Sequence, residues 1–233
     1  MKKTILLGIS LSLLSSVTWA ISEDDPFLHK VMIDQLEYRD GDKGNPWVWE
    51  ADAWAGKDLH KLWIKTEGEY VDSKTEEAEG QLLYSRAILP YWDVQVGWLH
   101  EFRPRPNRDW FAFALKGLAP YFFEIDASLF VGEEGRTALR VQAEHELMFT
   151  QRLVLSPEVE LNLFGKDDPE RGIGSGLSDI EAGLRLRYEF RREFAPYVGV
   201  NWTKRFGDTA DFARDEGEST SDVQFVTGVR AWF

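Results

Sequence analysis

The chain has 233 residues, of which 27 are basic and 40 acidic, so its formal net charge is −13 at neutral pH. A protein this acidic lacks the basic face that nucleic-acid binding needs. The absence of cysteine excludes a disulfide framework and a thiolate metal site. Aromatic residues make up 14% of the chain although its mean hydropathy is −0.36. This combination is unusual for a soluble domain and typical of a membrane β-barrel, which has an apolar lipid face and a polar lumen.

The first twenty residues predict export from the cytoplasm. Lys2 and Lys3 precede a short apolar run beginning at Ile5, and small residues lead to Ala20, which is the pattern of a secretory signal peptide cleaved after Ala20. The alternative, an uncleaved membrane anchor, needs about 20 apolar residues, and this run is shorter. Removal of residues 1–20 leaves 25 basic and 40 acidic residues, so the mature chain has a net charge of about −15.

From residue 31 onward the chain consists of runs of about ten residues of alternating polarity, separated by turn residues. The twelve predicted strands are Val31–Arg39, Trp47–Ala55, His60–Tyr70, Ala78–Ile88, Tyr91–Phe102, Asp109–Leu118, Tyr121–Val131, Arg136–Phe149, Leu153–Phe164, Ser178–Phe190, Ala195–Phe206 and Ser221–Phe233. A sheet in lipid must close, because unpaired strand edges are not tolerated there. We therefore predict an all-β, antiparallel, up-and-down transmembrane barrel of about 12 strands over residues 31–233, preceded by a short periplasmic segment at residues 21–30.

The connections between the predicted strands alternate in length. Short connections are expected at Gly56–Leu59, Leu89–Pro90, Ala119–Pro120, Thr150–Arg152 and Arg191–Phe194. The connections at the other end are longer, except for Gly132–Gly135, and lie at Asp40–Pro46, Val71–Glu77, Arg103–Arg108, Gly165–Leu177 and Gly207–Thr220. Short periplasmic turns and longer external loops are typical of outer-membrane barrels. A soluble β-sandwich would share the alternating polarity but does not predict this alternation of loop length.

Charged residues gather on one face of each predicted strand. Because a charge on the lipid face costs about 2–4 kcal/mol at the bilayer midplane, the charged face is expected to line the lumen. The residues assigned to this lumen network are Glu67, Glu69, Arg86, Glu124, Asp126, Arg140, Glu144, Glu146, Glu158, Glu160, Asp179, Glu181, Arg185 and Arg187. Two interpretations are compatible with each other: an ion-pair network that fills a narrow lumen, and a path that attracts cations.

Two further segments bear on the architecture. The last predicted strand ends on Phe233, and a terminal aromatic residue resembles the signal by which outer-membrane proteins are recognised for insertion. The glycine-rich run Gly172–Gly176 precedes a strand and not a helix, so a flexible loop is favoured over a phosphate site, which needs a helix N-terminus. The chain has no G-x-S-x-G, H-E-x-x-H or P-loop motif.

Few side chains could bind a soft or borderline metal ion. The candidates are His29, Met32, His60 and Met148, because imidazole and thioether groups suit such ions. His29 and Met32 lie at the mouth of the first strand, and His60 begins the third strand beside a periplasmic turn, so these three could be neighbours. Met148 shares the strand phase of Glu144 and Glu146. For each candidate, a role outside metal binding is the alternative.

Several segments resemble the CopB/PcoB copper-resistance family. They are Lys61–Glu69, Leu83–Ile88, Gly117–Tyr121, Leu147–Leu155, Gly174–Tyr188, Glu193–Val200 and Gly228–Phe233. The resemblance extends from about residue 30 to the end of the chain. It implies an outer-membrane barrel that binds copper or moves it across that membrane, and that acts with a periplasmic multicopper oxidase of the CopA type.

One feature departs from the family pattern. Many members carry a long segment rich in methionine and histidine ahead of the barrel, whereas only Ile21–Leu28 separates the signal peptide from the first strand here. Copper is therefore expected to bind within the barrel, at the first-strand mouth, with lumen carboxylates as weaker ligands. The expected function is copper resistance or homeostasis without catalysis. The alternatives are a diffusion pore for cations or small solutes, which a narrow lumen disfavours, and an outer-membrane hydrolase, for which the outward-facing His145 has no evident serine partner.

Overall fold

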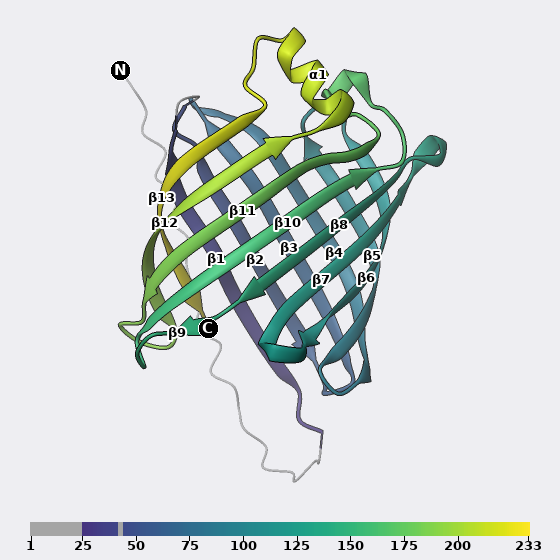
Figure 1. The fold of residues 1–233 in the computed structure, drawn as a ribbon. Helices are drawn as coiled ribbons and strands as arrows, with labels where there is room; N and C mark the ends of the chain where they lie inside the picture. The colour runs from purple at the N-terminus through teal and green to yellow at the C-terminus, as the bar shows by residue number, and fades with distance from the viewer. Residues whose placement is uncertain (1–24, 42–43) are drawn as a thin grey trace, which may run out of the picture.

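Each wall strand of the structure is antiparallel to its neighbours, and the first strand pairs with the last, so the sheet closes on itself (Figure 1). This computed structural model describes residues 25–41 and 44–233, and the predicted signal peptide therefore lies outside the described residues. The strands are β1 (Leu28–Asp40), β2 (Trp47–Gly56), β3 (His60–Val71), β4 (Lys74–Leu89), β5 (Trp92–Arg103), β6 (Arg108–Ala119), β7 (Phe123–Gly132), β8 (Thr137–His145), β9 (Leu147–Met148), β10 (Leu153–Phe164), β11 (Gly176–Tyr188), β12 (Phe194–Arg205) and β13 (Ser221–Trp232).

The short strand β9 continues β8 after a break at Glu146. Both β8 and β9 pair with β10, so the two labels belong to one strand of the wall. The wall therefore has twelve strands, and the predicted all-β up-and-down barrel is confirmed. Period-two alternation predicts such a barrel well because each strand has one apolar and one polar face.

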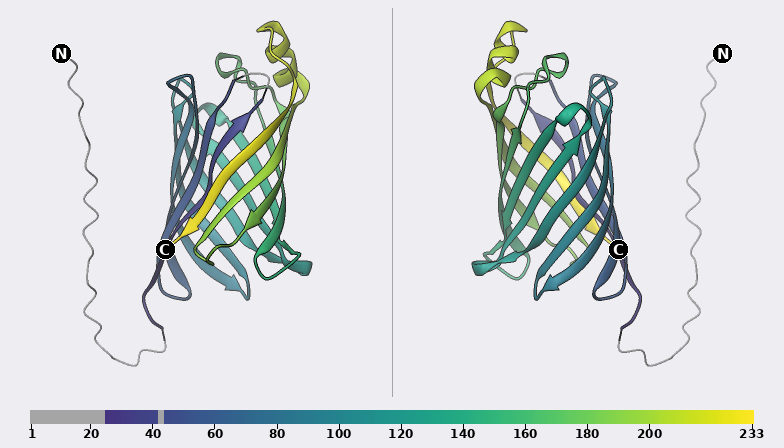
Figure 2. Two further views of the ribbon diagram at one scale, coloured as in Figure 1. Left: turned by 90° about the vertical axis from the view of Figure 1, so that its left-hand side faces the viewer. Right: turned by 90° about the vertical axis from the view of Figure 1, so that its right-hand side faces the viewer.

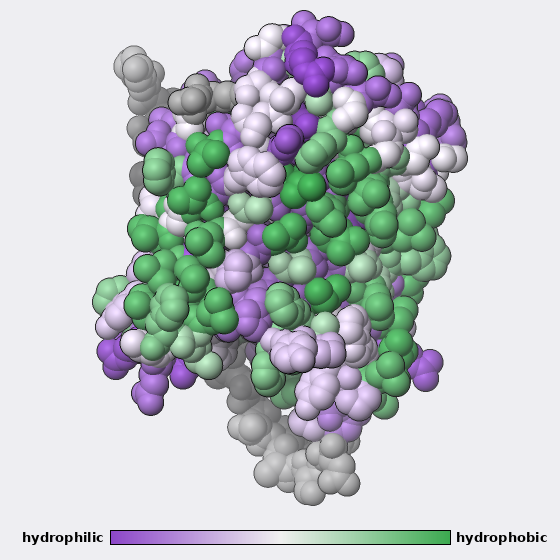
Figure 3. All heavy atoms as spheres, in the orientation of Figure 1, coloured by the Kyte–Doolittle hydropathy of each residue, from purple (hydrophilic) through white to green (hydrophobic). Residues whose placement is uncertain are grey.

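The outer wall is apolar and the inner wall is mainly polar. In β3, Leu62 and Ile64 are 51% and 56% exposed, whereas Trp63 and Lys65 line the lumen. Figure 3 shows hydrophobic side chains over the middle of the wall and hydrophilic ones at the end that carries helix α1 (Gly207–Asp215). A lipid environment stabilises this surface because it removes the exposed apolar side chains from water. The described residues include no helix whose length and hydrophobicity would suffice to cross a bilayer.

An apolar cluster inside the barrel covers the wall from β4 to β8. Its buried members are Leu83, Leu99, Trp110, Ala112, Phe130 and Ala138. Trp63 and Phe164 pack against this cluster from neighbouring strands. Since these side chains point inward, they occupy part of the lumen and leave less room for water there.

The two ends of the barrel differ, as Figures 1 and 2 show. One end has the C-terminus and short turns, including η1 (Pro120–Phe122). The other has α1, η2 (Glu133–Gly135) and η3 (Pro169–Arg171). Because outer-membrane barrels place their short turns in the periplasm, we call these the periplasmic and external ends.

The β3–β4 connection is tighter than expected. The sequence predicts a longer loop over Val71–Glu77, but β3 continues to Val71 and β4 begins at Lys74. Only Asp72 and Ser73 form the turn, with φ of 46° and 69°, as in the two-residue turns that join twisted strands. The sequence predicted a loop here because the residues at the hairpin tip are polar. They are polar because the strands project beyond the membrane at this point and need no apolar face.

Candidate functional site

The lumen is the candidate functional site, and a β-bulge in β1 decides which side chains line it. The pairing of β1 with β2 shifts register between Ile33 and Gln35, and its pairing with β13 shifts in the same region. Met32 faces the lumen before the shift, and the buried Glu37 and Arg39 face it afterwards. A bulge inserts one extra residue and therefore reverses the alternation of faces. Even-numbered and odd-numbered residues of the same strand consequently contribute to one site.

The completely buried carboxylate of Glu37 holds together one side of the lumen. It accepts hydrogen bonds from Arg39 Nε at 2.7 Å, Arg185 Nε at 3.0 Å and the Tyr197 hydroxyl at 3.0 Å. Arg185 also donates to Glu158 at 2.9 Å. These charge-assisted bonds join β1, β10, β11 and β12, so they fix the position of each member.

A second set of ion pairs crosses the lumen. Arg140 of β8 bonds to Glu67 of β3 and donates to Glu79 of β4 at 3.1 Å. Lys65 of β3 donates to Asp126 of β7 at 2.7 Å. These partners come from walls four or five strands apart in the twelve-strand order. The lumen is therefore narrowed at mid-height, where the remaining cavity has a volume of about 50 Å³.

A larger cavity of about 390 Å³, which we call the periplasmic chamber, lies between these ion pairs and the periplasmic end. Its lining includes Lys30, Met32, Asp34, Glu50, Asp52, Trp54, Trp63, Lys116, Leu118, Glu124, Glu144, Glu158, Arg185, Arg187, Tyr197 and Arg230. Part of this charge is paired, since Arg230 Nε lies 3.0 Å from Asp34. In the described part of the chain, Glu50, Asp52 and Glu124 have no basic group within ion-pair distance. The chamber thus combines carboxylates available to a cation with the thioether of Met32.

The structure does not bring the three predicted first-strand ligands together. Met32 faces the chamber. His29 lies three residues before Met32 in the regular part of β1, so it is on the opposite face of the strand and is exposed on the outer wall. His60 shares the outward side of β3 with Leu62, and its ring nitrogen Nδ1 contacts the hydroxyl of Tyr84. His29 and His60 thus lie on the outer wall near the periplasmic end, with β2 between their strands.

Met148 lies at the periplasmic rim. It pairs with the buried Val154 across β9 and β10 and is itself 68% exposed. Paired residues share a face of the sheet, so Met148 is on the lumen side but outside the chamber lining. In the described ranges, His, Cys, Asp and Glu side chains form no group of three or more with a geometry suited to a metal ion.

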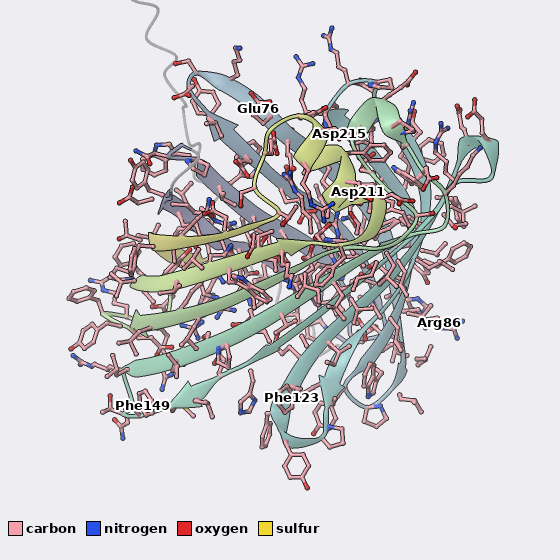
Figure 4. The ribbon with its side chains drawn as sticks, turned by 45° about the horizontal axis from the view of Figure 1, so that its top comes forward. Glu76, Arg86, Phe123, Phe149, Asp211 and Asp215 are labelled. Carbon is pink, nitrogen blue, oxygen red and sulfur yellow. The ribbon has the colours of Figure 1, made fainter. Side chains whose placement is uncertain are left out.

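Arg86 corrects the predicted lumen network. The inward face of β4 carries the buried Leu83 and Ser85, so Arg86 shares the outward face with Tyr84, and Figure 4 shows it at the outer surface. The prediction was wrong because a lone arginine near a strand end does not reveal the strand's phase. A long cationic side chain is tolerated there, since it can reach the aqueous interface. The other members of the network lie on the lumen side of their strands.

Several lumen charges escaped the sequence analysis. They include Glu37, Arg39, Lys65, Glu79, Lys116 and Arg230, together with the chamber residues Lys30, Asp34, Glu50 and Asp52. The phase of Lys65 could have been read from Glu67 and Glu69 on the same strand. Glu37 and Arg39 could not have been assigned in this way, because the bulge reverses the phase of β1.

The comparisons with known proteins agree with this architecture. Residues 27–233 match the family described as "Copper resistance protein B precursor (CopB)". The chain belongs to the CopB family. The "Copper resistance protein B" of Escherichia coli is 45% identical over 210 residues, covering 90% of this chain and 71% of that protein. A "Copper resistance protein B homolog" of Pseudomonas syringae pv. tomato is 44% identical and covers 86% of this chain and 68% of that protein. This CopB-family chain therefore has a role in copper resistance.

Two porins are among the solved structures similar to this CopB-family barrel. The NanC porin aligns with a TM-score of 0.57 at 14% identity, covering 88% of this chain and 99% of that one. The KdgM porin aligns with a TM-score of 0.51 at 12% identity and the same coverage of both chains. Similarity at this level shows the fold alone. Together with the apolar wall, it places this CopB-family protein in the outer membrane, in contact with lipid.

Proposed function

We propose that this barrel binds copper ions in the periplasmic chamber and thereby controls their passage across the outer membrane. The observation that carries the proposal is the meeting, in one cavity, of the Met32 thioether with carboxylates that lack an ion-pair partner. Copper is the cargo of the barrel in this proposal, and the barrel acts by binding and not as an enzyme.

The register of β1 and β2 supports a site at Met32. Met32 lies directly opposite Asp52, and opposed residues have Cβ atoms about 4.5–5.5 Å apart. Glu50 lies two residues from Asp52 on the same face, about 7 Å away. A thioether selects Cu(I), whereas carboxylates select poorly among metals but concentrate cations. Met32 would thus supply selectivity, and Asp52 and Glu50 would supply charge.

The ion pairs at mid-height argue against the alternative of a free diffusion pore. A cavity of about 50 Å³ has little room beyond a few water molecules. An ion that moves past Arg140 must exchange partners with its carboxylates, so passage would be selective and slow. Exchange of copper with a periplasmic multicopper oxidase of the CopA type remains a prediction from the family resemblance.

The test replaces the sulfur without changing the volume of the side chain. Met32→Leu should weaken Cu(I) binding to the purified barrel at least about tenfold. Loss of a residue that supports a metal site lowers metal affinity by about tenfold to a hundredfold, and leucine has nearly the volume of methionine. Cells that carry this variant should tolerate less copper. Met148→Leu is the matched control, because Met148 lies outside the chamber lining, and it should bind copper as the wild type does.

The same titration can overturn the proposal. If Met32→Leu leaves both binding and tolerance unchanged, the site at Met32 is wrong. The double variant His29→Ala, His60→Ala then tests the outer-wall histidines. A wild-type barrel that binds no copper and lets small solutes pass freely would support the diffusion pore.

A further inference from the structure

The external end of the barrel has a set of contacts that the proposed function does not use. The connection between β10 and β11 contains η3, and its residues Asp168 and Gly174 are buried. Its residue Arg171 bonds to Glu101 of β5, and its residue Asp168 accepts hydrogen bonds from Arg108 of β6. Strands β6, β7 and β8 separate β10 from β5. The connection therefore bends over the barrel mouth toward a distant part of the wall.

The first contact, Arg171 with Glu101, points into the barrel. Glu101 is on the lumen face of β5, two residues from the buried Leu99, and it also accepts a hydrogen bond from Trp110 Nε1 at 2.9 Å. The Arg171 side chain is only 4% exposed. A guanidinium loses most of its water at this burial, so it stays there only while the carboxylate pairs with it.

The second contact fixes the same connection to the rim. Arg108 donates to both carboxylate oxygens of Asp168, from Nε to Oδ2 at 3.1 Å and from Nη2 to Oδ1 at 3.2 Å, which is a two-pronged geometry. Arg136, immediately before β8, lies 3.6 Å from the same carboxylate. The Asp168 side chain is 9% exposed. Three charged side chains from three segments of the wall, Glu101, Arg108 and Arg136, thus pair with Asp168 or Arg171 of this connection.

Helix α1 holds the other half of the connection. The backbone N–H of Gly174 donates to the Thr209 hydroxyl at 2.8 Å, and that hydroxyl donates to Ser178 at 3.0 Å. A Cβ at Gly174 would meet the Thr209 backbone nitrogen at 2.5 Å, so only glycine fits this approach. The glycine-rich run of the sequence therefore serves close packing against α1, which stands on the external rim in Figure 1.

We propose that residues 165–175 are a latched gate at the external mouth, closed by the Arg171–Glu101 and Asp168–Arg108 pairs. While the latch is closed, copper exchanges with the periplasmic chamber from the periplasmic side only. Release of both pairs opens the external path. This inference rests on the proposed function for its cargo, but the gate itself can be tested without copper.

The test uses thiol access, because the natural chain has no cysteine. Ser128→Cys places a nearly isosteric reporter in the mid-height cavity, where Ser128 is buried. Intact cells receive a short pulse of a small cationic methanethiosulfonate. Glu134→Cys reports reagent outside the barrel, since Glu134 lies on the exposed external turn η2. Leu118→Cys reports reagent arriving from the periplasm, since Leu118 lines the chamber.

The latch is released with Glu101→Gln and Asp168→Asn, which keep the shape of both side chains and remove their charge. In this background the labelling rate of Ser128→Cys should rise several-fold, while the rates of Glu134→Cys and Leu118→Cys stay unchanged. The matched control is Arg214→Ala, which breaks an exposed pair inside α1 and should leave the labelling of Ser128→Cys slow.

Two results would overturn the gate. One is rapid labelling of Ser128→Cys with the latch intact, and the other is equally slow labelling after release. Each single charge removal is measured as well, and heat-dependent gel mobility verifies that each variant is folded. Copper titration of the released variant in detergent should match the wild type. If the labelling results support the gate but the barrel binds no copper, only the proposed function is rejected. If the barrel binds copper but labelling of Ser128→Cys does not depend on the latch, only the gate is rejected.

Discussion

At the residue scale, burial decides what an ion pair contributes. Glu37 is completely buried and bonded to Arg39, Arg185 and Tyr197. Glu134 bonds to Arg136 at 2.7 Å, but its side chain is 67% exposed. Loss of a buried carboxylate leaves its basic partners charged and shielded from water, which is strongly destabilising. Loss of an exposed carboxylate costs little, because water solvates the remaining charge. The Glu37 cluster therefore stabilises the barrel only while Glu37, Arg39 and Arg185 are all present.

Glu37→Ala tests this difference. The substitution should lower the free energy of unfolding by about 3–5 kcal/mol, because Arg185 and Arg39 lose their shared counter-charge. Urea unfolding of the refolded barrel in lipid measures the change. Glu134→Ala, the exposed counterpart, should change the same quantity by less than about 1 kcal/mol. Similar losses for both variants would mean that water already reaches the Glu37 cluster.

At the element scale, local backbone geometry places the functional side chains and shapes the ends of strands. The bulge in β1 turns Met32 and Glu37 toward the same lumen. The β3–β4 hairpin depends on two residues with left-handed backbone, Asp72 and Ser73. Non-glycine residues are strained in that region, by about 1 kcal/mol or more each. The hairpin therefore contains a site at which glycine should improve stability.

Ser73→Gly should raise the free energy of unfolding by up to about 1 kcal/mol, since glycine adopts a φ of 69° without strain. Thr75→Gly is the control with the opposite sign. Thr75 lies in extended β4 and pairs with Tyr70, so glycine there should destabilise the strand. Urea unfolding measures both variants. A loss of stability in Ser73→Gly would show that the serine side chain, and not its backbone, holds the turn.

At the scale of the whole molecule, the lumen is polarised along the barrel axis. The chamber lies toward the end with short turns, the cross-lumen ion pairs occupy the middle, and the latch lies at the end that carries α1. A path from the periplasmic end therefore passes the carboxylates without ion-pair partners first, then the cross-lumen ion pairs, and the latch last.

This polarity depends on the sidedness of the barrel, which protease can test. Protease added to intact cells should cut between α1 and β13, near Glu216–Thr220, and spare the turns at Pro90 and Pro120. The long connection should be external because outer-membrane barrels keep short turns in the periplasm. Gel analysis of outer-membrane fractions gives the readout. Cleavage that requires permeabilised cells would invert the assignment of the two ends.

The amino-acid sequence was enough to predict the closed twelve-strand architecture and most of the lumen face. Alternation with period two is a local property, and strands such as β10 display it with Val159 outward and Glu158 inward. The same property failed around the β1 bulge, because face assignment there depends on pairing with neighbouring strands. In β4 the alternation holds, and Arg86 was assigned to the wrong face of a regular strand. No local pattern predicts the pairing of Arg140 with Glu67 or of Arg171 with Glu101, because each pair forms only when the barrel closes. Such contacts join strands far apart in the chain, and their distances follow from closure of the barrel and not from any local pattern.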